Sequence, residues 1–116
     1  MSRQRDREEF IAVVCREAKA DLSMSEKIEK ARYLMRCAAT LKTIAERLCN
    51  EEMSDRETAR VDAKEANTEA RAQAVAESLG FKAIFSGDPR GYVFKVILPS
   101  AAYNTWGGAE SGWGVP

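Results

Sequence analysis

The sequence predicts an α+β fold, in which amino-terminal helices, including a long antiparallel helical hairpin, precede a β-hairpin and a Gly/Trp-rich tail. Residues 1–79 are charged and alanine-rich, and their apolar residues recur at helical spacing. All seven glycines and all three prolines lie at or after Gly80, together with most of the aromatic residues. At 116 residues the chain is expected to form a single domain, with a helical scaffold at 1–79 and the hairpin and tail at 80–116.

A stripe of apolar residues runs through the first expected helix, at about residues 3–21. The segment DLSMSEK then interrupts the pattern. Ser23, with Glu26 three residues later, forms a capping box there, and Ser25 is an alternative cap. The second helix is expected at about residues 25–50, where the amphipathic pattern is the clearest in the chain. Its apolar residues step by three and four: Ile28, Ala31, Leu34, Met35, Ala38, Leu41, Ile44, Ala45 and Leu48.

A second capping box, Ser54 with Glu57, begins the third expected helix, at about residues 55–79. With the second helix it would form an antiparallel hairpin about 35 Å long. Its apolar stripe is mostly alanine, which buries little area, so we expect helices of another copy to share this seam. The alternative is that the third helix is simply half-exposed. The stripe consists of Ala59, Ala63, Ala66, Ala70, Ala74, Val75 and Leu79.

Two β-branched and aromatic runs, 81–86 and 92–98, are expected to pair as a β-hairpin after Gly80 ends the third helix. Between them, Asp88-Pro89-Arg90-Gly91 fits a type I turn. Because a lone hairpin is only marginally stable in water, it must pack on the helices or extend into a sheet with a partner chain. Phe81, Ala83 and Phe85 are expected to share one face of the first strand, as are Tyr92, Phe94, Val96 and Leu98 on the second, with Lys82 and Lys95 on the opposite faces.

The tail, SAAYNTWGGAESGWGVP, is expected to be ordered because an exposed tryptophan invites aggregation; the alternative is a frayed end. Aromatic rings can stack on a base, and glycines let backbone N–H groups approach a ligand closely. Arg90 at the hairpin tip could hold a phosphate. The alternatives are that Arg90 only belongs to a turn and that the tail only packs over the hairpin. The candidate ligand-binding residues are Arg90, Lys95, Tyr103, Asn104, Thr105, Trp106, Gly107, Gly108 and Trp113.

The composition excludes several classes of function. The chain carries 18 basic and 18 acidic residues, which disfavours broad binding to duplex nucleic acid or a membrane surface, because both need a basic excess; a local basic patch is left open. It contains no histidine, which excludes Ser-His and Cys-His nucleophile systems and the common zinc hydrolase sites. Cys15, Cys37 and Cys49 lack CxxC spacing and are expected to be small buried hydrophobes. We therefore expect no catalytic residue, no metal and no cofactor.

The basic residues of the second helix are scattered, which favours a solvated face over a nucleic-acid stripe: Lys30, Arg36, Lys42 and Arg47. No apolar run is long enough to cross a membrane, and the first ten residues, MSRQRDREEF, lack the hydrophobic region of a signal peptide. The protein is therefore expected in the cytoplasm.

The run LKTIAERLCNEEMSDRE, a charged alanine-rich helix, and then the motifs GDPRG, LPS, NTWGG and GWGVP cover about residues 41–116. This arrangement resembles a group of small uncharacterised proteins encoded by bacteriophages and prophages of Gram-negative bacteria. Relatives often have Gly-Arg after LPS, where this chain has AAY. The resemblance implies no established activity. It implies a context, that of a short accessory gene of a phage, for which the expected cytoplasm is that of the host cell.

Phage accessory proteins of this size often counter host defence, and two expectations follow by analogy. The first is a non-enzymatic sponge, a homo-oligomer that sequesters a small anionic nucleotide signal in a pocket between copies. Arg90 and Lys95 would then neutralise phosphate. Trp106, Tyr103 or Trp113 would stack on a base, and hydrogen bonds would come from Asn104, Thr105 and the Gly107-Gly108 backbone. The second is an inhibitor that binds a host defence protein through its charged helices, like anti-CRISPR or anti-restriction proteins. An enzyme is a third alternative, for which no catalytic group can be named.

Overall fold

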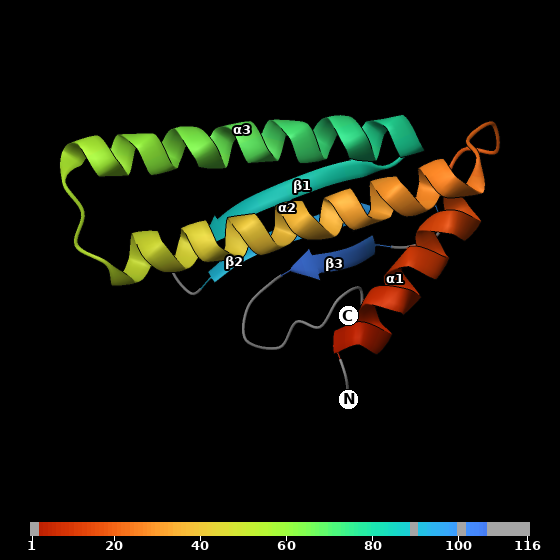
Figure 1. Cartoon of the computed structure of the whole chain (residues 1–116), viewed down its shortest axis with the longest axis horizontal. Helices are drawn as coiled ribbons and strands as arrows, with labels where there is room; N and C mark the ends of the chain where they lie inside the picture. The colour runs from red at the N-terminus through yellow and green to blue at the C-terminus, as the bar shows by residue number, and fades with distance from the viewer. Residues whose placement is uncertain (1–2, 89–90, 100–101, 107–116) are drawn as a thin grey trace.

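Three helices and three strands make up the computed structural model, which describes residues 3–88, 91–99 and 102–106, with side chains at 7–85 and 94–99. Figure 1 shows α2 and α3 side by side in one layer, the strands behind them, and α1 at an angle near the start of α2. The structure confirms the predicted helices, the antiparallel helical hairpin and a small antiparallel sheet. The elements are α1 (Arg3–Glu17), α2 (Met24–Asn50), α3 (Asp55–Leu79), β1 (Lys82–Asp88), β2 (Gly91–Ile97) and β3 (Ala102–Trp106).

The two predicted capping boxes are both present. Before α2, the Glu26 backbone N–H donates to Ser23 Oγ (3.1 Å), and the Ser23 backbone N–H donates to Glu26 Oε1 (3.0 Å). Ser54 and Glu57 make the same reciprocal pair before α3, at 3.2 and 3.4 Å. At the other end of α3, Gly80 has a φ of 91°, a left-handed conformation that glycine adopts without a Cβ clash. Local contacts therefore set both starts and one end of the long helices.

The first helix is shorter than expected, because α1 ends at Glu17. Beyond it, the backbone N–H of Lys19 donates to the carbonyl of Leu79 at the end of α3, at 3.1 Å. A backbone donor that pairs with a distant carbonyl is lost to the helix it would have continued. This contact ties the end of α1 to the end of α3.

The core lies between the helical layer and the sheet. Phe10 of α1, Leu34 of α2, Leu79 of α3 and Phe94 of β2 are fully buried. The rings of Phe85 and Phe94 lie 4.9 Å apart, centroid to centroid, in a tilted arrangement across the two strands. Burial of one such side chain contributes about 1.5–3 kcal/mol. The helices and the sheet therefore stabilise one another.

The predicted hairpin is confirmed, with strand bounds shifted by one or two residues. β1 and β2 pair antiparallel from Lys82 opposite Ile97 to Asp88 opposite Gly91, so two residues separate the strands. Those two residues, 89 and 90, lie outside the described part of the chain. Where side chains are described, the predicted faces are correct, with Phe81, Phe94, Val96 and Leu98 buried and Lys82 and Lys95 exposed.

The sequence analysis did not predict a third strand, yet β3 pairs antiparallel with β2 and makes β2 the central strand. The register shifts between Phe94 and Lys95, so the ladder between β2 and β3 is irregular at this point. An unpaired edge of β2 would expose a row of backbone donors and acceptors. The start of the tail satisfies that edge, so the chain itself extends the hairpin and no partner chain is needed for it.

The predicted alanine stripe is not the face that α3 packs against the rest of the chain. α3 packs on both α2 and β1 (Figure 1), and the face that it buries includes Val61, Ala72 and Leu79. Valine and leucine remove more apolar area from water than alanine does, so they decide which face turns inward. Of the predicted stripe, only its end packs inward, at Val75 and Leu79. The other members are exposed: Ala59, Ala63, Ala66, Ala70 and Ala74.

Candidate functional site

The structure brings part of the predicted ligand site onto adjacent strands. Lys95 of β2 is exposed on the sheet face away from the helices, and its backbone partner on β3 is Asn104. Tyr103 pairs with Val96, and Trp106 pairs with Phe94. Thr105 also lies in β3, whose side chains are not among those described. The other predicted positions lie outside the described residues: Arg90, Gly107, Gly108 and Trp113.

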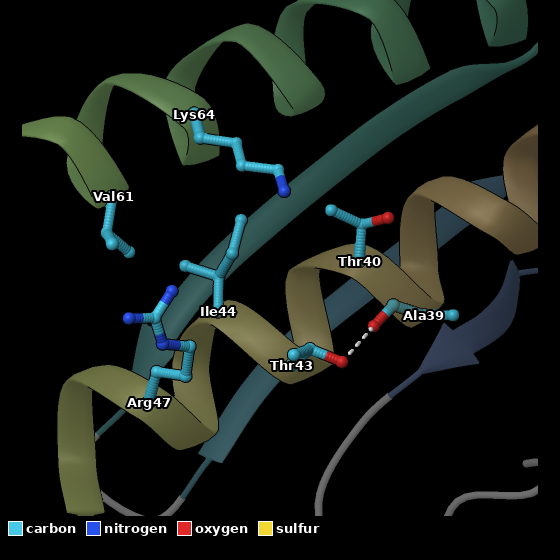
Figure 2. A pocket seen from close by; sticks show the side chains of 7 residues that line it. All are labelled: Ala39, Thr40, Thr43, Ile44, Arg47, Val61 and Lys64. Carbon is cyan, nitrogen blue, oxygen red and sulfur yellow. Dashed lines mark hydrogen bonds between the residues drawn. The ribbon is translucent and has the colours of Figure 1, made fainter. Parts of the chain in front are cut away.

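A hollow of about 270 Å³, here called the interhelical hollow, is lined by residues of α2 and α3, and the strands lie behind it in Figure 2. Figure 2 shows Ile44 and Arg47 pointing from α2 toward α3, while Val61 and Lys64 point back. Ile44 and Val61 are buried and form an apolar floor. Ile44 and Arg47 are three residues apart, as are Val61 and Lys64, and residues three or four apart share one helix face. Each pair therefore points to the same side of its helix. The lining consists of Ala39, Thr40, Thr43, Ile44, Arg47, Val61 and Lys64.

The polar groups of the interhelical hollow are only partly engaged. Thr43 Oγ1 donates to the Ala39 carbonyl at 3.1 Å, which leaves the oxygen free to accept a hydrogen bond. The Arg47 Nε lies 3.4 Å from Glu51 Oε1, in an ion pair whose side chains are 42% and 53% exposed, so the pairing is weak. Lys64 forms no ion pair with any other residue that the structure describes. Arg47 Nη2 also donates to Met53 Sδ at 3.7 Å, so Lys64 and the remaining donors of Arg47 are the groups that a ligand can use.

Two further hollows, of about 370 and 630 Å³, adjoin one another on the outward face of α2. Both are lined by Arg32 and Arg36, and Arg7 of α1 lines the smaller one. The smaller one also shares Ala39 with the interhelical hollow, so the three hollows follow each other along α2. Glu29 is the one acidic residue in their described lining. We name this surface the basic face; its cations are Arg7, Arg32, Arg36, Arg47 and Lys64.

The sequence analysis does not predict the basic face, because it considers how the basic residues are spaced along the chain and not how they are placed around the helix. Lys30, counted with them, instead donates to Ser78 Oγ on α3 at 2.9 Å and is partly buried. Arg32, which was left out, is four residues from Arg36 and fifteen from Arg47, spacings that keep all three close to one helix face. Arg36 also lies 5.5 Å from the ring centre of Tyr33, which holds the guanidinium by a cation–π contact.

Charges on α3 are divided between its two flanks. Arg71 lies seven residues after Lys64, on the flank toward α2. Burial raises the pKa of the Cys37 thiol on α2, and the nearby charges of Arg36 and Arg71 partly oppose this rise. On the other flank, burial and the neighbouring Asp62 carboxylate raise the pKa of Glu65. One side of α3 is therefore basic and the other acidic.

The three cysteines differ in burial, although the sequence analysis predicts that all three are buried. Cys37 is buried, Cys15 is half-buried and Cys49 is exposed. A buried thiol with a raised pKa is a poor nucleophile, so Cys37 fits the predicted role of a small hydrophobe. The exposed Cys49 does not.

The chemistry of the basic face is recognition of anions by guanidinium, ammonium and hydroxyl groups. Within the described residues, three or more metal-binding side chains do not gather at any point. None of the described helices has both the length and the apolar character to span a bilayer.

Comparison with protein-family models, with curated proteins and with solved structures found no match for this chain. Function therefore has to be inferred from the chemistry of the surface.

Proposed function

We propose that the protein is a non-enzymatic phage accessory protein that counters host defence by binding and sequestering a small anionic nucleotide. The supporting observation is the interhelical hollow, where Arg47 and Lys64 from two helices stand over an apolar floor. The resemblance of the tail motifs to phage proteins supplies the biological context. In this proposal the ligand site moves from the tail to the helical layer, and the protein remains in the host cytoplasm.

The chemistry of the hollow suits a phosphate attached to an apolar or aromatic group. Arg47 can hold two phosphate oxygens at once, and Lys64 adds a second positive charge. Thr40 and Thr43 supply hydroxyl groups for the phosphate or a ribose. A volume of about 270 Å³ falls just below the usual range for small-molecule sites, so the ligand is a small nucleotide.

The expected affinity requires more than these two cations. A hydrogen bond to a charged group contributes about 1.5–3 kcal/mol, while association costs at least ~4 kcal/mol of translational and rotational freedom. Two such contacts roughly cancel that cost. Useful affinity therefore requires further enclosure, which a second copy of the chain can supply.

Calorimetric titration with a panel of cyclic and ADP-ribose-type nucleotides tests the proposal. We expect one nucleotide to bind, and Lys64→Ala to weaken its binding about tenfold or more, as loss of a charged hydrogen bond predicts. Lys82→Ala, on the exposed sheet face, is the matched control and should bind as the unaltered protein does. If no nucleotide in the panel releases heat, the proposal is wrong.

Trp106→Ala separates the helical site from the predicted tail site. If the interhelical hollow holds the ligand, this variant keeps full affinity while Lys64→Ala loses it. The reverse result would place the ligand at the tail, with Trp106, Tyr103 and Asn104 as the binding groups.

A second candidate function, inhibition of a host defence complex by direct protein binding, is supported by the extent of the basic face. From Arg32 to Arg47 it extends for about 22 Å along α2, farther than a small nucleotide reaches. Affinity capture from phage-infected cells distinguishes the two functions. One dominant host protein that Arg32→Glu/Arg36→Glu releases and Lys64→Ala retains would favour the inhibitor.

A further inference from the structure

We infer that the acidic flank of α3 from a second copy of the chain docks along the basic face, and that it walls the interhelical hollow. The second part of this inference rests on the proposed function; the docking itself does not. The acidic flank is defined by three exposed carboxylates of α3, Asp55, Asp62 and Glu77.

The basic face provides half of the contact. Arg7, Arg32 and Arg36 form no ion pair with any other residue that the structure describes. Their guanidinium groups line hollows that also contain apolar side chains, Ile11 and Met35 among them. Arginine beside apolar residues is typical of protein interfaces, where it often contributes much of the binding energy.

The spacing of charges matches between the two surfaces. Arg32 and Arg47 are fifteen residues apart on α2, and Asp62 and Glu77 are fifteen residues apart on α3. On a straight helix each separation is about 22 Å. One α3 laid along α2 of another copy can therefore place one carboxylate near Arg32 and the other near Arg47. A ligand in the interhelical hollow would then share Arg47 with that carboxylate, and Lys64 would remain its own cation.

The surface between Asp62 and Glu77 allows close approach. The exposed residues Ala66 and Ala70 have short side chains, so this helix can approach α2 at the lower end of the usual interaxial distances, about 8 Å. The part of α2 that it would meet includes Ala39, which borders the interhelical hollow. Docking would therefore cover the open side of that hollow.

The balance of charge favours a second copy over a nucleic acid strand. Glu29 lies within the lining of the basic face, and a uniformly anionic strand would meet its repulsion. α3 carries exposed residues of both signs on its two sides, Arg56 and Arg60 on one and the acidic flank on the other, so a second copy is not uniformly anionic. The chain as a whole has no net charge, so two copies approach without long-range repulsion.

Light scattering on the full chain measures the association. We expect a mass of at least twice the 12.9 kDa of one chain. Arg32→Glu/Arg36→Glu should give a monomer by removing the basic half of the contact, and Asp62→Lys/Glu77→Lys should do the same by removing the acidic half. Lys82→Glu, on the sheet face, is the control and should stay associated. Circular dichroism checks that each variant keeps its helices.

Mixing the two double variants gives the decisive result. In Arg32→Glu/Arg36→Glu the basic face has become acidic, and in Asp62→Lys/Glu77→Lys the acidic flank has become basic, so each variant repels itself. The two altered surfaces attract one another, so the mixture should recover the mass of the unaltered protein. A monomeric unaltered chain would overturn the inference, as would an oligomer that neither variant dissociates or a mixture that stays monomeric.

Titration of the same proteins with the nucleotide panel separates this inference from the proposed function. If association follows the charge swaps while no nucleotide binds, the docking stands and the proposed function fails. If a nucleotide binds the unaltered chain and the monomeric variants with equal affinity, the second copy does not wall the hollow, and that part of the inference is overturned.

Discussion

At the scale of single residues, two half-buried glutamates show how the packing of α3 changes the chemistry of its side chains. Glu65 and Glu69 lie one turn apart, on the same side of α3 as the acidic flank. Burial is the main cause that raises the pKa of both carboxyl groups, and a neighbouring carboxylate adds to it: Asp62 for Glu65, and Glu65 for Glu69. The sequence analysis placed neither residue at a packed face, because it turned the alanines inward in their place.

These raised pKa values predict that the contribution of Glu65 and Glu69 to stability falls with rising pH. The folded state holds a proton on Glu65 more tightly than the unfolded state does, so unfolding releases protons. The free energy of unfolding therefore decreases as pH rises from the ordinary value of 4.5 through the folded pKa, and then levels off. Glu65→Gln should raise stability at pH 7 and flatten this decrease.

Urea unfolding between pH 4 and pH 7 measures the effect. The difference in free energy of unfolding between Glu65→Gln and the unaltered chain should grow with pH. Glu46→Gln, an exposed position on α2, is the matched control. A difference that stays constant with pH, or that shrinks, would contradict the assignment of burial as the cause.

At the scale of elements, local hydrogen bonds determine where the long helices begin. Ser23 and Ser54 each exchange two hydrogen bonds with a glutamate three residues later. Such contacts are visible in the sequence because both partners lie within one turn. The face that a helix buries is not visible in the same way. α3 turns Val61 and Leu79 inward because it has two neighbours, α2 and β1, and only the fold supplies both.

Removal of a cap should cost stability in a predictable amount. Ser54→Ala removes the hydroxyl that accepts from the backbone N–H of Glu57. We therefore expect a loss of about 1 kcal/mol in the free energy of unfolding. Ser54→Gly should cost only a few tenths of a kcal/mol. Thermal or urea unfolding followed by circular dichroism measures both, with Ser25→Ala, an exposed serine inside α2, as the control. An unchanged stability for Ser54→Ala would show that tertiary packing alone fixes this terminus.

At the scale of the whole molecule, the helical layer and the sheet share one core and should unfold together. Phe94 of β2 is fully buried within that core and contacts the ring of Phe85. Phe94→Ala should cost about 3–5 kcal/mol. Its exposed neighbour in the same strand, Lys95→Ala, should stay within about 0.5 kcal/mol of the unaltered chain.

Two probes test whether the helical layer and the sheet both lose stability in Phe94→Ala. Helix content by circular dichroism and tryptophan fluorescence should follow the same transition in the unaltered chain, and both should move to lower denaturant in Phe94→Ala. A helical transition that stays in place while the fluorescence transition moves would mean that the two layers fold independently.

The sequence by itself determined what depends on short-range contacts: the caps at Ser23 and Ser54, the glycine end of α3, and the alternating faces of the β1–β2 hairpin. Only the tertiary structure decided which face of α3 is buried, that β3 completes the sheet, and that Arg7, Arg32, Arg36, Arg47 and Lys64 form one basic face. The reason is physical. A cap or a turn is a contact between near neighbours in the chain. A buried face or a shared charged surface depends on the distance between separate elements, which the packing of the core sets.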